Sequence, residues 1–157
     1  MSASLLMERL QFIKVLDPVA NAFAATPTTE VVNMSKFSRI VFVVHIGVGA
    51  AGTSTFTVEA CDDVVPSTQV AVAHTSRAIT TGDTEGALTA RAAAGHIPAA
   101  QTSQILLFEV SESALAASGY SYVRLKAVES NAAAVLGGIL AIGEAKVISA
   151  SKATAIV

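Results

Sequence analysis

Charged side chains are scarce in this chain of 157 residues. They make up 14% of it, against roughly 25% in typical soluble domains, and the formal net charge is only -2. Hydrophobic residues make up 52%. A surface with so few charges does little to keep identical copies apart. The composition therefore predicts a protein that packs against copies of itself or against a partner.

Tryptophan is absent and aromatic residues make up only 5%, so a core must be built mainly from Val, Ile, Leu and Ala. Such side chains form thin layers, which suit stacked β-sheets. The single cysteine, Cys61, cannot form an internal disulfide, so nothing in the chain depends on an oxidising compartment. We expect Cys61 to be a buried, apolar thiol.

Long hydrophobic runs are missing as well. The two most apolar segments, Ile40–Gly52 and Ala132–Gly143, are shorter than the ~20 residues that a membrane-spanning helix requires, and glycines interrupt both. Near the N-terminus, Glu8 and Arg9 break the apolar run that a secretory signal needs, and no A-x-A type cleavage site follows. The sequence thus predicts neither a membrane span nor secretion by that route.

The patterns of nucleic-acid binding and of catalysis are also lacking. The 10 basic residues are dispersed, the isoelectric point is about 5.9, and no aromatic platform lies among the basic side chains. No serine lies in the G-x-S-x-G motif that exposes a nucleophile at a sharp turn. We therefore expect no nucleic-acid partner, no catalytic residue and no enzymatic activity.

The histidines do not form a metal-binding pattern. His45, His74 and His96 lie far apart, without H-x-H or H-E-x-x-H spacing, and Cys61 has no second cysteine with which to form a zinc pair. We expect His45 within a buried strand with its ring nitrogens hydrogen-bonded. His74 and His96 are expected on loops or on a solvated strand face.

Two short acidic clusters remain, Asp62-Asp63 and Asp83-Thr84-Glu85. Neither has the ligand count or the glycine placement of a calcium-binding loop. The ordinary interpretation is that Asp62 and Asp63 end a strand and start a turn by accepting backbone amides. The sequence therefore predicts no metal ion and no cofactor.

One glycine-rich segment imitates a nucleotide-binding motif. Gly47–Gly52 matches G-x-G-x-x-G and follows a predicted strand. That motif binds a dinucleotide because a helix begins at the loop and directs its amides at the pyrophosphate. Here Thr53–Cys61 alternates instead, with Phe56, Val58 and Ala60 on one side, so no helix follows. We predict a hairpin loop that joins two strands.

The pattern of the chain is mainly that of strands. Ser38–Ile46 is a continuous apolar run, which predicts a strand buried on both faces. The other predicted strands are Glu30–Met34, Thr53–Cys61, Gln69–Ser76, Ile105–Ser111, Tyr122–Glu129 and Val135–Ile142. The pair Gly137-Gly138 indicates a bulge or a close backbone approach. Because no βαβ alternation occurs, we predict an all-β fold, an antiparallel β-sandwich or a jelly-roll-like barrel.

Two segments are candidate helices. Leu5–Leu16 is either a short helix or an extended arm, and Pro18–Thr29 is a connector, so residues 1–28 are assigned to an arm and connector and 29–157 to a single β-sandwich domain. Glu112–Ser118 predicts a short helix, with Ser111 as N-cap and Gly119 at its end. Gly82–Ala100 predicts a long loop of the kind that contacts partners.

The chain as a whole resembles small structural proteins encoded among the head genes of tailed phages. The segments that carry the resemblance are Asp17–Phe23, Val31–Ser35, Gly47–Ser54, Thr57–Asp63, Gly86–Ala90, Ala114–Tyr120, Tyr122–Ala127 and Gly137–Ala141. Its motifs are structural rather than catalytic. The chain departs from the pattern at Thr75-Ser76-Arg77, where an aromatic and basic cluster is expected.

The resemblance implies a capsid decoration, or cement, protein of the virion. Such a protein is made in the cytoplasm of the host bacterium and binds the major capsid protein on the outer face of an expanded capsid. It often does so as a homotrimer at local threefold positions. The apolar N-terminal segment could lie across a neighbour, and deletion of Met1–Leu16 is expected to weaken particle binding while the sandwich still folds.

Two alternatives remain open. A tail-tube, neck or head-fibre protein would need a similar surface but would assemble as rings or spikes. A carbohydrate-binding adhesion module is a further class, but sugar sites usually stack rings on exposed aromatics. Tyr120 and Tyr122 are the two aromatic residues close enough in the sequence to suggest such a site.

Overall fold

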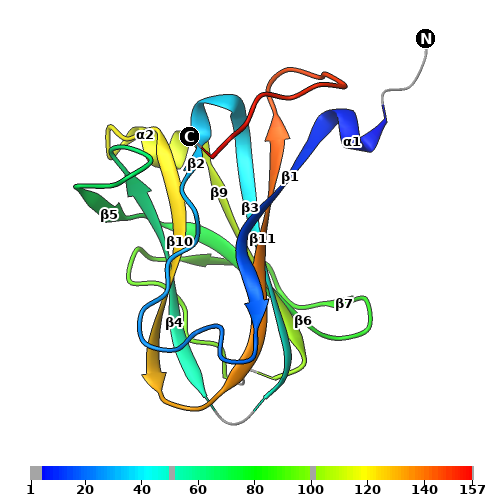
Figure 1. Ribbon diagram of the computed structural model, residues 1–157, viewed down its shortest axis with the longest axis vertical. Helices are drawn as coiled ribbons and strands as arrows, with labels where there is room; N and C mark the ends of the chain where they lie inside the picture. The colour runs from blue at the N-terminus through cyan, green and yellow to red at the C-terminus, as the bar shows by residue number, and fades with distance from the viewer. Residues whose placement is uncertain (1–4, 50–51, 100–101, 157) are drawn as a thin grey trace.

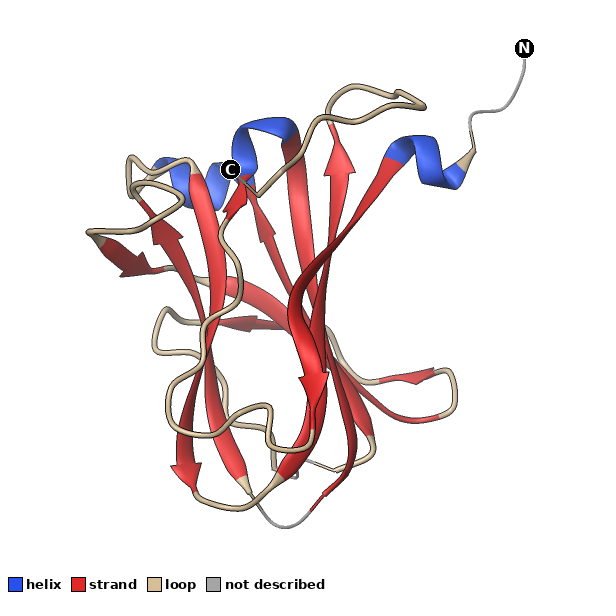
Figure 2. Cartoon of the chain, viewed as in Figure 1, coloured by secondary structure: helices blue, strands red, loops and turns tan. Residues whose placement is uncertain are grey.

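The computed structural model describes residues 5–49, 52–99 and 102–156, and most of them lie in two antiparallel sheets that face each other (Figures 1 and 2). The larger sheet contains, in order, β1 (Leu10–Val19), β11 (Val135–Ala145), β3 (Phe37–Gly49), β9 (Gln104–Ser111), β6 (His74–Thr81) and β7 (Thr84–Glu85), with β8 (Thr89–Arg91) also paired to β6. The smaller sheet contains β2 (Val32–Asn33), β10 (Tyr122–Asn131), β4 (Thr53–Cys61) and β5 (Gln69–Ala71). The predicted all-β antiparallel sandwich is confirmed.

The core lies between the inner faces of the two sheets. In β4 the predicted alternation is confirmed, since Phe56, Val58 and Ala60 are fully buried. Phenylalanine rings join the layers, because Phe56 lies with its ring centre 5.3 Å from that of Phe23 and 5.5 Å from that of Phe108. Phe23 comes from the predicted connector, so that segment supplies part of the core.

The predicted hairpin between the strands that flank Gly47–Gly52 is wrong. β3 pairs with β11 and β9, whereas β4 pairs with β10 and β5, so the chain crosses from one sheet to the other here. Each strand has one mainly apolar side, which is buried. In a hairpin both sides would lie on one surface of a single sheet, whereas in the sandwich they cover each other. Ala50 and Ala51 of this loop lie outside the described residues.

The segment Gln69–Ser76 is likewise not one strand. β5 lies in the smaller sheet and β6 begins at His74 in the larger one, with the crossing at Val72 and Ala73. Val72 is buried, so the crossing is held by a side chain in the core. Alternation along the chain could not reveal a change of sheet.

The N-terminal segment is mostly a strand. A four-residue helix, α1 (Leu6–Arg9), precedes β1, which pairs with β11 at the edge of the larger sheet. Ile13 and Val15 of β1 are buried, so the helical alternative for Leu5–Leu16 is wrong beyond residue 9. Pro18 is tolerated inside β1 because the strand lies at an edge.

Three local predictions are confirmed. The second helix, α2 (Glu112–Ala116), is shorter than predicted, but the Ser111 hydroxyl accepts a hydrogen bond from the Ala114 amide, 3.4 Å away. Gly119 follows with a φ of +75°. At Gly138 an added Cβ would lie 2.9 Å from the Cα of Pro18, where β1 is bulged, so the backbones approach closely.

Among the described residues, no helix is both long and apolar enough to cross a membrane.

Candidate functional site

The outward side of the larger sheet is unusually apolar. Because strand side chains alternate, burial of Phe42 and Val44 in β3 turns Val41 and Val43 outward, where they are half-buried. The prediction that Ser38–Ile46 is buried on both faces is therefore wrong. The described structure covers only the inner face.

The register of the sheet places these outward residues in rows. Val43 lies beside Leu140 of β11 and Leu107 of β9, and the same row ends at Lys14 in β1 and Arg77 in β6. The rows on either side are also mainly apolar on β11 and β3, and one of them contains Glu109 of β9. We call the resulting surface the outer face; its apolar members are Phe12, Val41, Val43, Ile79, Ile105, Leu107, Leu136, Leu140 and Ile142.

Such a surface is unusual because antiparallel sheets with one solvated side normally alternate apolar with polar residues. Phe12 is 49% exposed and Leu136 is 46% exposed, although both are large apolar residues. Contiguous apolar patches of this kind mark surfaces that bind something. The outer face is therefore our candidate functional site.

The charges on and near the outer face are paired, and most of them lie at its borders; Glu109 lies beside Val41 on β9. Arg39 contacts Glu109 at 3.2 Å and Glu144 at 3.1 Å at one end of the strands. On the two lateral borders, Lys14 contacts Asp17 at 2.9 Å, and Arg77 contacts Glu85. The outer face consequently has no large excess of either sign with which to attract nucleic acid or a strongly charged partner.

A hollow of about 500 Å³ lies on the outer face. It is lined mainly by apolar groups from β1, β11, β3 and β9, among them Leu16, Pro18, Val43, Ile105 and Leu136. Its lining includes Gly138, at which the close approach of Pro18 leaves no room for a side chain. The hollow can accept an apolar side chain but offers few polar groups for a specific small ligand.

A second apolar feature projects from one end of the sandwich. We call it the N-terminal tip: α1, Leu5, and the neighbouring Val147 and Ile148, whose apolar side chains are 58% to 74% exposed. The Lys152 ammonium donates to the carbonyl oxygen of Leu10 at 2.9 Å and to that of Met7, which ties α1 to the C-terminal loop. In Figure 1 the two segments lie together, at the end of the sandwich where the N-terminal segment projects.

The histidines are placed differently from the prediction. His45, predicted to be buried, is exposed on the outer face, because it shares the outward side of β3 with Val43. His74, predicted on a loop or solvated face, is 6% exposed and contacts the ring of Phe108. His96 lies on a loop as predicted, is half-buried and pairs with Phe56.

His74 is the buried titratable group of greatest interest. Its Nδ1 donates to the carbonyl oxygen of Val72 at 3.2 Å, and its Nε2 is buried without a hydrogen-bond partner among the described residues. Burial lowers the pKa of His74, and the nearby Arg91 lowers it further. The lowered pKa favours the neutral imidazole, which is the form that a core position requires.

The remaining candidate residues, Cys61 and Asp62, lie in the core and in a turn, where they contribute to the fold. Cys61 is fully buried as predicted, and burial raises its pKa to about 11. Asp62 accepts from the amides of Ser67 and Thr68, both at 3.1 Å, which confirms the predicted turn. The hydrogen bond from the Ser67 hydroxyl, together with those from the two amides, lowers the pKa of Asp62. Within 5–49, 52–99 and 102–156, no three His, Cys, Asp or Glu residues gather as a metal site would require.

The sequence contained a signal for the outer face that the prediction did not use. In a strand with one solvated side, an apolar residue is normally followed by a polar one, but Ile105-Leu106-Leu107-Phe108 and Ile139-Leu140-Ala141-Ile142 are apolar throughout. Both runs were predicted as strands. Their outward residues, Ile105, Leu107, Leu140 and Ile142, belong to the outer face.

Comparisons with known proteins add one structural similarity. No family model matches the chain, and no curated protein matches it. Among solved structures, the crystal structure of the SPBc2 prophage-derived protein YomS is similar, with a TM-score of 0.46 and 12% sequence identity. The alignment covers 85% of this chain and 91% of that chain.

Proposed function

We propose that this protein is a structural component of a tailed-phage particle that binds the outer surface of the capsid and stabilises it. The observation that carries the proposal is the apolar outer face, a surface suited to assembly on a chain with few charges. The resemblance of its sequence motifs to phage head proteins indicates that the assembly is a phage particle. In this role the protein has no enzymatic activity, and its partners are the major capsid protein and copies of itself.

We assign binding of the capsid to the N-terminal tip. α1 has no buried residue, so its apolar side chains contribute nothing to the core of the sandwich. Each such contact is small, but a lattice of repeated sites and linked copies gives avidity without a strong single site. The protein would accumulate on the capsid surface after its synthesis in the host cytoplasm.

The proposal is tested by co-sedimentation of the protein with capsids that lack it, with unexpanded and expanded shells compared and the bound copies counted by mass spectrometry. We expect saturable binding to expanded shells at hundreds of copies per particle. A handful of copies, or ring formation in solution, would instead favour a tail-tube, neck or head-fibre protein. Absence of binding to either shell would contradict the proposal.

A truncation separates the tip from the sandwich. Deletion of residues 1–16 would remove the buried Ile13 and Val15, so the smaller deletion of residues 1–9 is the appropriate variant. We expect it to fold and to bind shells at least tenfold more weakly. The matched control is Val65→Lys, which alters an 82% exposed valine away from the tip and should bind normally. Unchanged binding by the truncated protein would exclude the tip.

A further inference from the structure

The chain closes both lateral sides of the sandwich, where the two sheets are not hydrogen-bonded to each other as neighbouring strands are. On the side between β1 and β10, the Glu30 amide donates to the carbonyl oxygen of Val15 at 2.9 Å. The neighbouring Thr29 amide donates to Leu125 of β10, also at 2.9 Å. On the side between β4 and β6, residues 92–98 follow β8 and are hydrogen-bonded to β4. We call residues 92–98 the closing segment.

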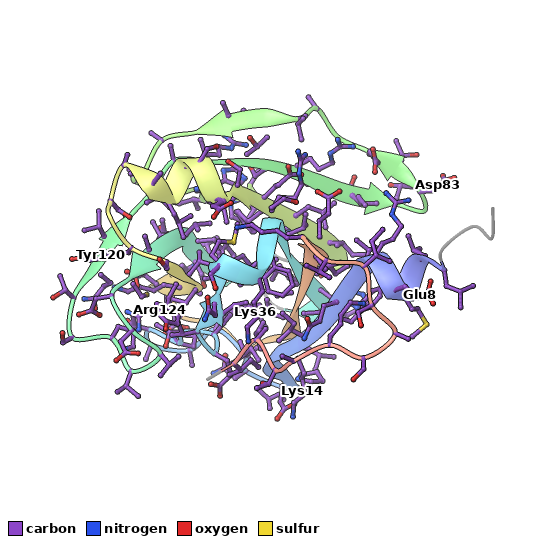
Figure 3. The ribbon with its side chains drawn as sticks, turned by 90° about the horizontal axis from the view of Figure 1, so that it is seen from above. Glu8, Lys14, Lys36, Asp83, Tyr120 and Arg124 are labelled. Carbon is purple, nitrogen blue, oxygen red and sulfur yellow. The ribbon has the colours of Figure 1, made fainter. Side chains whose placement is uncertain are left out.

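The two closed sides lie apart in the molecule. In Figure 3, Lys14 of β1 and Arg124 of β10 mark the first side, and Asp83, in the turn that follows β6, lies on the opposite side. The two sides are closed by separate pieces of chain with separate contacts. Opening of one side can therefore be measured against the other.

Two backbone hydrogen bonds hold the closing segment at the edge of β4. The His96 amide donates to the carbonyl oxygen of Phe56, and the Phe56 amide donates to that of His96, both at 2.9 Å. Beside them, a Cβ added at Gly95 would collide with the Phe56 carbonyl oxygen, and the φ of Gly95 is +90°. Glycine is therefore the residue that fits this position. The segment is seated closely, and Pro98 at its end is buried.

At the closing segment, two histidines lie against the same aromatic ring, with an arginine beside them. The ring centres of His74 and His96 lie 5.7 Å and 6.5 Å from that of Phe108. Arg91 of β8 lies beside His74 in the register and donates from Nε to the Ser76 hydroxyl at 2.8 Å. The Nε2 of His74 is buried and has no hydrogen-bond partner among the described residues, so a proton added there would meet no acceptor.

The groups that face these histidines are uncharged or positive. Arg91 is the charged group that acts on His74, and Arg91 and His74 act on His96. The strands packed against them turn uncharged side chains inward, namely Phe56, Val58 and Ala60 of β4 and Leu106, Phe108 and Val110 of β9. The charged residues of β4, β9 and β6 lie on the outward sides of their strands, namely Glu59, Glu109 and Arg77. Protons added to the two histidines would therefore repel each other and Arg91.

We propose that the closing segment is an acid-sensitive switch, in which protonation of His74 and His96 beside Arg91 releases residues 92–98 from β4 while the two sheets stay packed. Opening exposes the backbone N–H and C=O groups of Phe56 at the edge of β4, where another strand can pair. The switch is a property of the sandwich itself. It is additional to the proposed structural role and does not require a capsid, so a failure of co-sedimentation would leave it standing.

The direction of the switch follows from the state in which each histidine holds its proton more firmly. Burial lowers the pKa of His74 and of His96 in the closed state, and Arg91 lowers both further. In the open state each pKa returns toward about 6.5, so the open state takes up protons first. The closed state is therefore fully favoured above pH 6.5 and is lost as the pH falls toward the closed-state pKa. Between pH 7.5 and pH 5.0 each histidine can raise the opening equilibrium by up to about thirtyfold.

Amide hydrogen exchange of the full chain, followed residue by residue by NMR, tests the switch. The His96 and Phe56 amides report on the closing segment, and the Thr29 amide reports on the other side and on unfolding of the whole domain. We expect protection of the first two, corrected for the intrinsic exchange rate, to fall at least about tenfold more than that of Thr29 between pH 7.5 and pH 5.0. Equal falls at all three amides would indicate global acid unfolding and overturn the proposal.

Histidine variants locate the protons. His45→Gln alters the exposed histidine of the outer face and is the matched control, which should behave like the wild type. His96→Gln should reduce the selective loss of protection in acid, and His74→Gln/His96→Gln should remove it. A double variant with the pH dependence of the wild type would refute the switch.

Two further variants make the test independent of how glutamine packs at these positions. Arg91→Gln keeps both histidines but removes the charge that lowers their pKa in the closed state, so the loss of protection between pH 7.5 and pH 5.0 should be smaller. Gly95→Ala collides with β4, so the Phe56 amide should be poorly protected already at pH 7.5 while circular dichroism shows an intact sandwich. A larger acid effect in Arg91→Gln would contradict the switch, as would a Gly95→Ala variant that is either unfolded or as protected as the wild type.

Discussion

The two sheets of the sandwich expose opposite kinds of outer surface. On the larger sheet most of the central outward residues are apolar, and most of the charges lie at the borders. On the smaller sheet the outward residues of β4 and β10 are mostly polar, and the Glu59 carboxylate lies between Arg124 at 2.7 Å and Lys126 at 3.3 Å. Both sheets bury one apolar face in the same core, so folding alone requires only the inner faces.

This difference between the two outward surfaces indicates which sheet binds a partner. The outward residues of the smaller sheet satisfy one another, since Arg124 and Lys126 both use Glu59 and need no partner from outside. The outward residues of the larger sheet gain nothing comparable within the monomer. A half-buried apolar side chain such as Val43 still has surface to remove from water, at about 25 cal/mol per Å². Assembly would use the larger sheet and leave the smaller one solvated.

The largest expected effect comes from breaking the charge cluster of the smaller sheet. Glu59 is 6% exposed, so Glu59→Ala leaves two neighbouring cations without their carboxylate in a poorly solvated place. We expect unfolding free energy to fall by about 4 kcal/mol, because removal of one partner from a buried ion pair strands the other charge. Urea denaturation followed by circular dichroism measures this loss.

The matched control is Glu109→Ala on the border of the larger sheet. Arg39 keeps Glu144 at 3.1 Å, and the pair is largely exposed, so the loss should be below about 1 kcal/mol. Equal losses for the two variants would remove the contrast between the surfaces.

Two adjacent leucines in β9 sharpen the comparison between inner and outer faces. Leu106 is 1% exposed in the core, and Leu106→Ala should cost about 3 kcal/mol of unfolding free energy through lost burial and a cavity. Leu107→Ala alters the outer face, so it should cost the monomer less than about 1 kcal/mol and weaken self-association instead. Denaturation at low protein concentration and sedimentation at high concentration separate the effects. A destabilised Leu107→Ala monomer with normal association would contradict this division.

The sequence predicted the strands better than their partners. Alternation identified the inner residues of β4 because the period of two is a local property. Membership of a sheet is not local: β3 and β4 follow each other but lie in different sheets, since each covers the apolar side of the other. The break between β5 and β6 is equally invisible, because Val72 continues the alternation while the chain changes sheets.

The candidate site was predictable only in part. Low charge indicated assembly, but the surface responsible depends on which side of each strand faces outward and on which strands are neighbours. Val43, Leu107 and Leu140 are separated by up to about a hundred positions in the sequence and form one row only through the strand order. The burial of His74 and the exposure of His45 depend on the same register, which is why both were placed wrongly.

The smallest expected effect concerns the histidines of the larger sheet, one buried and one exposed. Burial lowers the pKa of His74 in the folded protein, so the unfolded chain, in which the pKa is about 6.5, takes up its proton first. The stability that the neutral imidazole allows is therefore fully present above pH 6.5 and is lost as the pH falls from there toward the folded-state pKa. Urea unfolding between pH 7.5 and pH 5 should show this decline, and His74→Gln should reduce its slope. The pKa of His96 is also lowered, so part of the slope should remain in that variant and diminish further in His74→Gln/His96→Gln. An identical slope in wild type and His74→Gln would mean that the ring of His74 is protonated or solvated in the folded protein, and the acid sensitivity would then have to arise elsewhere.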